Sequence, residues 1–193
     1  MKNIIAVMAI GMIAGCVATP QAVAPGPFAS EAGFSVPLSN SWSHWASSIN
    51  YQTNGEYLTK DGVDLNRLHL ISLADGEALV KAGRDTDLPK YSSSSSEIDI
   101  ADFVAASLKR VGYSSMEAEA IEPASFDGRE GISFKLSGKT EKGLNIAGDA
   151  AAVKSGEALK LVIFLAPAVH YYDASAEEVG GIISGIDFPG SES

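Results

Sequence analysis

Residues 144–166, LNIAGDAAAVKSGEALKLVIFLA, contain two apolar runs joined by the turn sequence KSGE. The second run, residues 159–166, is almost entirely apolar, which is typical of a central strand. Just upstream, Ile132, Phe134 and Leu136 alternate with polar residues, as in a strand with one buried face. Because the links between these runs have hairpin length, we expect an antiparallel sheet.

Shorter strands are expected earlier in the chain, at residues 41–46, 56–59 and 65–73. The pairs Asn54-Gly55 and Asp61-Gly62 supply turns that tolerate positive φ. The serine-rich stretch at residues 92–96 is interpreted as a loop.

A first helix is predicted after this loop, capped by Ser96 or Asp99 and ending before Gly112. Its apolar residues recur at helical spacing, which indicates one buried face. They are Ile100, Phe103, Val104, Leu108 and Val111.

A second helix is predicted at the carboxyl end, opening with a capping box at residues 175–178. The pair Gly180-Gly181 is interpreted as allowing close approach of this helix to the sheet. The fold class predicted is therefore α+β, with an antiparallel sheet sandwiched by helices. The apolar face of this second helix contains Val179, Ile182, Ile183 and Ile186.

The amino terminus has the organisation of an export signal, with Lys2 followed by an apolar run at residues 4–14. The run is too short to span a bilayer, which takes roughly 20 apolar residues. The sequence Ile13-Ala14-Gly15-Cys16 resembles the lipobox of bacterial lipoproteins.

That resemblance implies removal of residues 1–15 as a signal peptide and lipidation of Cys16 at its sulfur and its new amino group. Val17, in place of the aspartate that retains lipoproteins at the inner membrane, implies the periplasmic face of the outer membrane. The expected location is the bacterial cell envelope, with the membrane bound through the lipid anchor.

Residues 16–33, beginning with Cys16 and rich in proline and alanine, are interpreted as a tether, and residues 34–189 as a single globular domain. An extended tether of this kind reaches roughly 40 Å at about 3.1 Å per residue. The full chain carries a formal charge of −10, which argues against a nucleic-acid partner. With a single cysteine, the domain has no disulfide.

The second half of the chain, residues 98–188, resembles the group that contains PsbP, Mog1 and DcrB-like lipoproteins. The likeness rests on the order helix, strand, hairpin, helix and on Phe126-Asp127-Gly128-Arg129, which is interpreted as a turn. It implies an antiparallel sheet between helices and a noncatalytic accessory or binding role.

Two aromatic segments are candidates for ligand binding. Trp42 and Trp45 flank His44, and in a strand Trp42 and His44 share one face while Trp45 lies on the other. His170, Tyr171 and Tyr172 follow the central strand, where a loop meets a rigid scaffold. The alternative for both segments is that the rings complete the core.

Signatures of catalysis are lacking in the sequence, including the Gly-x-Ser-x-Gly elbow, His-Glu-x-x-His and the phosphate-binding loops. We therefore expect no enzymatic activity and no cofactor. Asp61, Asp64, Asp85 and Asp87 lack the alternating spacing of a calcium loop, so no metal site is predicted.

The leading hypothesis is a lipid-anchored, noncatalytic envelope domain that binds a protein partner or acts as an accessory module. The alternative is a carrier of a small apolar ligand, a lipid or glycan fragment, held by the aromatic candidates. A hydrolase is the third possibility, and it requires His44 or His170 to meet a serine and an acid.

Overall fold

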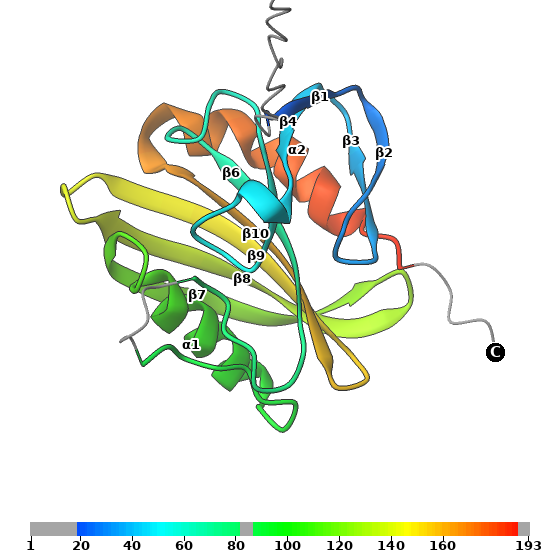
Figure 1. Ribbon diagram of the computed structural model, residues 1–193, viewed down its shortest axis with the longest axis vertical. Coiled ribbons are helices and arrows are strands. Elements are labelled where there is room, and N and C mark those ends of the chain that lie inside the picture. The colour runs from blue at the N-terminus through cyan, green and yellow to red at the C-terminus, as the bar shows by residue number, and fades with distance from the viewer. Residues whose placement is uncertain (1–18, 82–86, 189–193) are drawn as a thin grey trace, which may run out of the picture.

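The computed structural model describes residues 19–81 and 87–188. In these residues a strongly twisted sheet is covered by one helix on each face (Figure 1). Helix α1 (Glu97–Leu108) packs on one face, and α2 (Asp173–Ser184) packs on the other together with a small hairpin. The predicted α+β sandwich is confirmed.

The sheet has eight strands in the order β1-β4-β5-β6-β10-β9-β8-β7, and each neighbouring pair is antiparallel. Strand β10 lies in the interior of the sheet, as its apolar sequence predicted. The sheet strands are β1 (Gln21–Val23), β4 (Trp42–Trp45), β5 (Gly55–Thr59), β6 (Arg67–Leu73), β7 (Tyr113–Phe126), β8 (Arg129–Thr140), β9 (Asn145–Ser155) and β10 (Ala158–Pro167).

The segment interpreted as a tether contributes to the folded domain. Strand β1 pairs with β4, and β2 (Gly26–Ala29) forms a separate hairpin with β3 (Ser35–Leu38). Both pairings supply backbone hydrogen bonds that an isolated proline-rich spacer lacks. The prediction of a tether through residue 33 is therefore wrong for residues 21–29, and the ordered domain begins well before Phe34.

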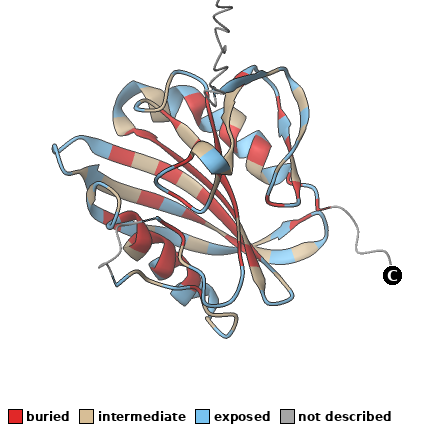
Figure 2. Ribbon diagram, in the orientation of Figure 1, coloured by how far each residue is buried: buried red, intermediate tan, exposed pale blue. Residues whose placement is uncertain are grey.

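One face of the sheet forms a core with α1. Ile132, Phe134 and Leu136 of β8 point into it, as their alternation predicted, beside Leu161 and Ile163 of β10. Figure 2 shows buried residues concentrated along the middle of the sheet and on the sides of the helices that face it.

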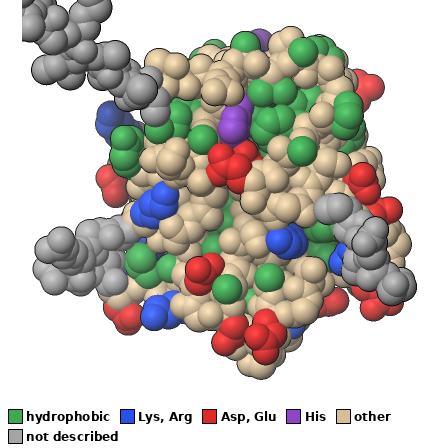
Figure 3. Space-filling view, turned by 45° about the vertical axis from the view of Figure 1, so that its right-hand side comes forward, with side chains coloured by type: hydrophobic (Ala, Val, Ile, Leu, Met, Phe, Trp, Pro, Cys, Tyr) green, Lys and Arg blue, Asp and Glu red, His purple; other side chains and the backbone are tan. Residues whose placement is uncertain are grey.

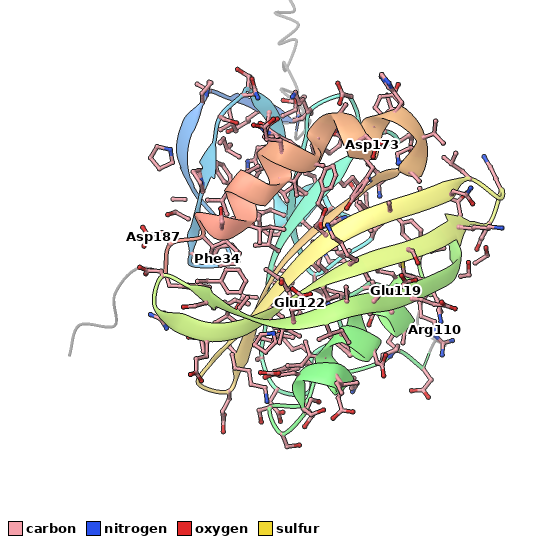
Figure 4. The ribbon with its side chains drawn as sticks, turned by 180° about the vertical axis from the view of Figure 1, so that it is seen from behind. Phe34, Arg110, Glu119, Glu122, Asp173 and Asp187 are labelled. Atoms are coloured by element: carbon pink, nitrogen blue, oxygen red, sulfur yellow. The ribbon has the colours of Figure 1, made fainter. Side chains whose placement is uncertain are left out.

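The opposite face forms a second core with α2 and β3. Leu58, Leu68 and Phe164 of the sheet contact Val179 and Ile182 of the helix in this cluster. The chain after α2 returns to the β2–β3 hairpin, because the backbone of Asp187 exchanges hydrogen bonds with Ser35. Figure 4 shows Asp187 close to Phe34 at this end of the molecule.

The two helix starts differ in how well the sequence predicted them. Ser96 caps α1 in a capping box with Asp99, as predicted. The capping box predicted at residues 175–178 does not form, since α2 begins at Asp173 and Ser175 is buried within its first turn. The turn η2 (Ala168–Tyr172) leads directly from β10 into α2, so no serine cap is needed to start it.

The paired glycines of α2 do not support the predicted close packing. A Cβ atom placed on Gly180 or Gly181 meets no atom within 4 Å, and both positions are exposed. Gly180 and Gly181 therefore lie on the side of α2 that faces away from the sheet. The helix contacts the sheet through Val179 and Ile182 instead.

Strand β7 was not predicted, although it is the longest strand of the sheet at 14 residues. Its pairing with β8 shifts between Glu119 and Glu122, and Ala120 there has a φ of 48°. Figure 4 shows these two glutamates along the outer strand. The β7–β8 link confirms the predicted turn, with Asp127 and Gly128 both at positive φ.

Candidate functional site

One histidine and two glutamates meet beside the first strands of the sheet. His44 belongs to β4, Glu56 to β5, and Glu31 to the turn between β2 and β3. Nε2 of His44 lies 2.6 Å from Oε2 of Glu56, and the side-chain ligand atoms of the three residues all lie within 4.8 Å of one another. We call this group the His44 cluster.

Hydrogen bonds from the main chain hold both carboxylates of the His44 cluster. The backbone N–H of Glu31 donates to Oε1 of Glu56, and the backbone N–H of Ser47 donates to Oε2 of Glu31 over 3.2 Å. The ring of Phe28 lies 5.2 Å from the His44 ring, centroid to centroid. The three side chains are therefore positioned by β2, β4, β5 and the turn η1 (Ser47–Ile49).

Burial dominates the electrostatics of this cluster. The Glu56 side chain is only 1% exposed, whereas His44 is 15% exposed. Burial raises the pKa of Glu56, against the lowering effect of the Glu31 N–H and of His44, and the nearby Glu31 charge raises it further. Figure 3 shows a histidine beside acidic side chains at the surface, with hydrophobic side chains around them.

Sequence reasoning missed this cluster for two reasons. Glu31 lay in the presumed tether, and no local pattern indicates that it approaches β4 and β5. Glu56 carried the one available signal, because its alternation with Tyr57 places it on the same face as Leu58, which is completely buried. A charged residue at such a position needs a partner.

The five predicted aromatic and histidine candidates do not converge. Trp42 is buried under α2, whereas Trp45 stacks on Tyr57 at 5.6 Å between ring centroids on the opposite face of the sheet. The predicted separation of Trp42 and Trp45 is confirmed, as is the expectation that at least one of them belongs to the core. An apolar-ligand carrier needs these rings in one cleft, and this arrangement does not favour it.

The second candidate segment forms the turn between β10 and α2. Tyr171 and Tyr172 pack at the margin of the core under α2, and the Tyr172 ring stacks on Phe164 at 6.5 Å between centroids. The Tyr172 hydroxyl accepts a hydrogen bond from Nζ of Lys135 over 3.1 Å. His170 is exposed and has a φ of 76°.

Neither surface-accessible histidine meets the requirement for a hydrolase in the described residues. His44 bonds to a carboxylate, and no hydrogen bond joins His44 or His170 to a serine hydroxyl in residues 19–81 and 87–188. His69 is fully buried and approaches Thr53, with 3.3 Å between Nδ1 and Oγ1. Asp61 and Asp64 contact Asn66 and Arg67, and Asp85 lies outside the described residues.

Two hollows stand out at the surface. A cavity of about 350 Å³ lies at one end of the sheet, beside Arg67, Tyr113, Leu144 and Pro167. A groove of about 530 Å³ runs between α2 and the link from β3 to β4, beside Asn40, Lys60 and Glu178. None of the five sequence candidates lines either hollow.

One strongly exposed apolar side chain lines the first of these hollows, Leu144, which is 50% exposed. Two more lie close in sequence to its lining residues. Tyr51 precedes Gln52 and is 83% exposed, and Val169 follows Pro167 by two positions and is 79% exposed. Residues 144 and 169 lie at adjacent strand ends, because Ile146 of β9 pairs with Pro167 of β10. We call Tyr51, Leu144 and Val169 the apolar rim.

Comparison with solved structures identifies the fold. The solution structure of the cyanobacterial PsbP protein CyanoP from Synechocystis sp. PCC 6803 matches with a TM-score of 0.57 and 11% identity, over 95% of this chain and 99% of that one. A crystal structure from Bacteroides thetaiotaomicron matches with a TM-score of 0.51 and 10% identity, over 89% of this chain and 51% of that one.

The Ran-binding protein Mog1p of Saccharomyces cerevisiae matches with a TM-score of 0.48 and 9% identity, over 87% of this chain and 94% of that one. No protein-family model and no curated protein sequence matches this chain. The PsbP-like fold is thus confirmed, and the likeness to CyanoP covers the first half of the chain as well as the predicted residues 98–188.

Proposed function

We propose that this protein is a lipid-anchored, noncatalytic domain of the bacterial cell envelope that binds a protein partner at the apolar rim. The observation that carries the proposal is the exposure of Leu144 in the lining of one cavity, with Tyr51 and Val169 exposed in the segments next to its lining residues Gln52 and Pro167. Among the large hydrophobic residues that are strongly exposed in the described chain, only Ile98 lies elsewhere, on α1. Exposed apolar side chains beside a surface hollow are typical of interaction surfaces.

The surroundings of the apolar rim suit a protein rather than a small apolar ligand. Asp64, Arg67, Glu141 and Lys142 line the same cavity, so both signs of charge border the apolar side chains. Apolar contacts with a polar border are the usual organisation of a protein interface. Figure 1 shows the β8–β9 turn and the β10–α2 link together at the left side of the molecule.

The proposed anchor holds the domain close to the membrane. Four residues, 17–20, separate Cys16 from the first residue of β1. At about 3.3–3.6 Å per residue, the chain from Cys16 to Gln21 reaches at most about 18 Å. Among the described residues, no helix is long and apolar enough to cross a membrane. Val17 supports the outer membrane as the destination.

The anchor is tested by the mass of the mature protein and by labelling with a palmitate analogue. The expected mature chain begins at Cys16 and carries the acyl label, whereas Cys16→Ala incorporates none. A wild-type chain that begins elsewhere and carries no label contradicts the anchor, independently of the binding surface.

The binding surface is tested by site-specific photocrosslinking in intact cells that produce the full-length protein. A photoreactive residue at position 169 is expected to capture one defined protein, whereas the same residue at position 98, which is 63% exposed in the wild type, is the matched control. Leu144→Asp is expected to reduce the capture at position 169 at least tenfold. Equal patterns at both positions, or capture unaffected by Leu144→Asp, contradict the proposal.

A further inference from the structure

The His44 cluster carries more negative charge than its neighbours balance. It contains two carboxylates, and in the described part of the chain no lysine or arginine forms a salt bridge with Glu31 or Glu56. Lys81, which is close in the fold, donates instead to the backbone carbonyls of Ser47 and Asn50. Among the described residues, the one side chain with a nitrogen that contacts a carboxylate of the cluster is His44, at 2.6 Å from Glu56.

The spacing of the three side chains is close to that of a metal coordination shell. Ligand atoms bound to Zn²⁺ at about 2.0–2.1 Å in a tetrahedron lie about 3.3 Å from one another. The separation of His44 and Glu56 is 2.6 Å, and all three ligand atoms lie within 4.8 Å of one another. To reach a spacing of about 3.3 Å, the His44–Glu56 separation must widen by about 0.7 Å and the widest separation must shorten by at most about 1.5 Å, distances that side-chain movements can supply.

The supporting hydrogen bonds also resemble those of a metal site. The N–H groups of Glu31 and Ser47 each bind one carboxylate of the cluster, which fixes its orientation and leaves its other oxygen or lone pairs for an ion. Such outer contacts orient the ligands in established metal sites. Because each ligand comes from a different segment, an ion would tie the β2–β3 turn to the main sheet.

We propose that Glu31, His44 and Glu56 form a binding site for one divalent transition-metal ion, best matched by Zn²⁺. The imidazole favours Zn²⁺ and related ions over Ca²⁺ and Mg²⁺, which prefer oxygen ligands alone. One Zn²⁺ neutralises the two carboxylates while His44 binds as the neutral ring. Three protein ligands leave a fourth position on the solvent side, where His44 and Glu31 are accessible.

This site is independent of the proposed protein-binding surface. His44 of β4 pairs with Gln21 of β1, so the cluster lies near the sheet edge formed by β1. Strand β1 is the first strand after Cys16, the proposed site of lipid attachment. The apolar rim involves β9, the link after β10 and the segment around Tyr51 instead. Failure of the metal proposal would therefore leave the protein-binding proposal unaffected.

The test is titration of Zn²⁺ into the full-length lipoprotein, purified in detergent and freed of metal with a chelator. Isothermal calorimetry is expected to give one Zn²⁺ per chain, and Co²⁺ is expected to give the visible absorption of a nitrogen- and oxygen-ligated ion. His44→Gln and Glu31→Gln are each expected to weaken Zn²⁺ binding at least tenfold. Millimolar Ca²⁺ is expected not to displace Zn²⁺.

The matched controls are His170→Gln and Glu177→Gln, which alter an exposed histidine and an exposed glutamate elsewhere. Both are expected to bind Zn²⁺ as the wild type does. Glu31 is exposed, so Glu31→Gln keeps the test valid even if a change at His44 disturbs folding. Absence of stoichiometric Zn²⁺ binding, equal binding by Glu31→Gln and wild type, or loss only in His170→Gln overturns the proposal.

Discussion

The indole Nε1 of Trp42 donates a hydrogen bond to Oε1 of Glu178 over 3.0 Å, joining residues 136 positions apart in the sequence. Nζ of Lys60 donates to the other oxygen of the same carboxylate over 2.9 Å. Hydrogen bonds from Lys60, Trp42 and Asn40 outweigh the opposing effect of burial and lower the pKa of Glu178. Strands β4 and β5 are thereby connected to α2 through one side chain.

Replacement of Glu178 by alanine is expected to destabilise the protein by about 1–3 kcal/mol, because the buried indole N–H loses its acceptor. The side chain of Glu178 is 8% exposed, whereas the adjacent Glu177 is exposed and serves as the matched control. Urea unfolding monitored by tryptophan fluorescence measures both variants. Equal midpoints for Glu177→Ala and Glu178→Ala would show that this connection contributes nothing.

Two glycine-to-alanine changes are expected to act in opposite directions. A Cβ atom at Gly148 of β9 would lie 2.2 Å from the carbonyl oxygen of Phe164, so Gly148→Ala is expected to cost about 1–3 kcal/mol. Gly180 of α2 has open space around it, and alanine there is expected to stabilise the helix by up to about 1 kcal/mol. Guanidinium unfolding of the two variants and the wild type measures whether each change lowers or raises the free energy of unfolding.

His69 is expected to make folding stability depend on acid. Burial, with a further contribution from the charge of Arg67, lowers the pKa of His69 from 6.5 to about 3. Below pH 6.5, His69 therefore binds a proton in the unfolded chain but stays neutral in the folded chain until the pH approaches 3. The free energy of unfolding is consequently unaffected by His69 above pH 6.5 and decreases progressively as the pH falls from 6.5 toward 3.

At about 1.36 kcal/mol per pH unit, this loss amounts to about 2–3 kcal/mol between pH 6.5 and 4.5. Comparison with His69→Gln isolates it, since the carboxylates titrate in both proteins. The free energy of unfolding of the wild type is expected to fall more steeply than that of the variant over this range. Parallel curves would assign the acid sensitivity to other groups.

His170 is expected to be a site of stored backbone strain. Its φ of 76° and ψ of −60° correspond to a γ-turn conformation that is rare for residues with a side chain. His170→Gly is expected to raise stability by about 1 kcal/mol, because glycine adopts positive φ without strain. His170→Ala removes the ring but keeps the Cβ atom, so thermal unfolding of the two variants separates backbone strain from ring contacts.

The sequence predicted the parts of the fold that depend on local patterns. Alternation at Ile132, Phe134 and Leu136 gave the buried face of β8, and Ser96 with Asp99 gave the start of α1. Asp127-Gly128 gave the hairpin turn that follows β7. Each of these features is decided by a few neighbouring residues.

Features that depend on distant partners could not be predicted in this way. Strand β1 has only three residues, and it forms because β4 lies beside it. Its own short sequence, flanked by prolines, resembles a linker. Strand β7 has no apolar alternation, because much of its length is exposed. The His44 cluster depends on another long-range contact, in which the backbone N–H of Glu31 donates to the carboxylate of Glu56, 25 positions later.

The two edges of the sheet affect how copies of this protein meet. Strand β1 offers three residues of open backbone, and β7 changes register near both Tyr113 and Ala120 and contains Pro123, which has no N–H to donate. Short or irregular edges are poor templates for adding a strand from another molecule. Among the described strands, neighbouring copies therefore find no long, regular edge along which to join their sheets into a filament, and the same holds if the proposed anchor crowds them on a bilayer.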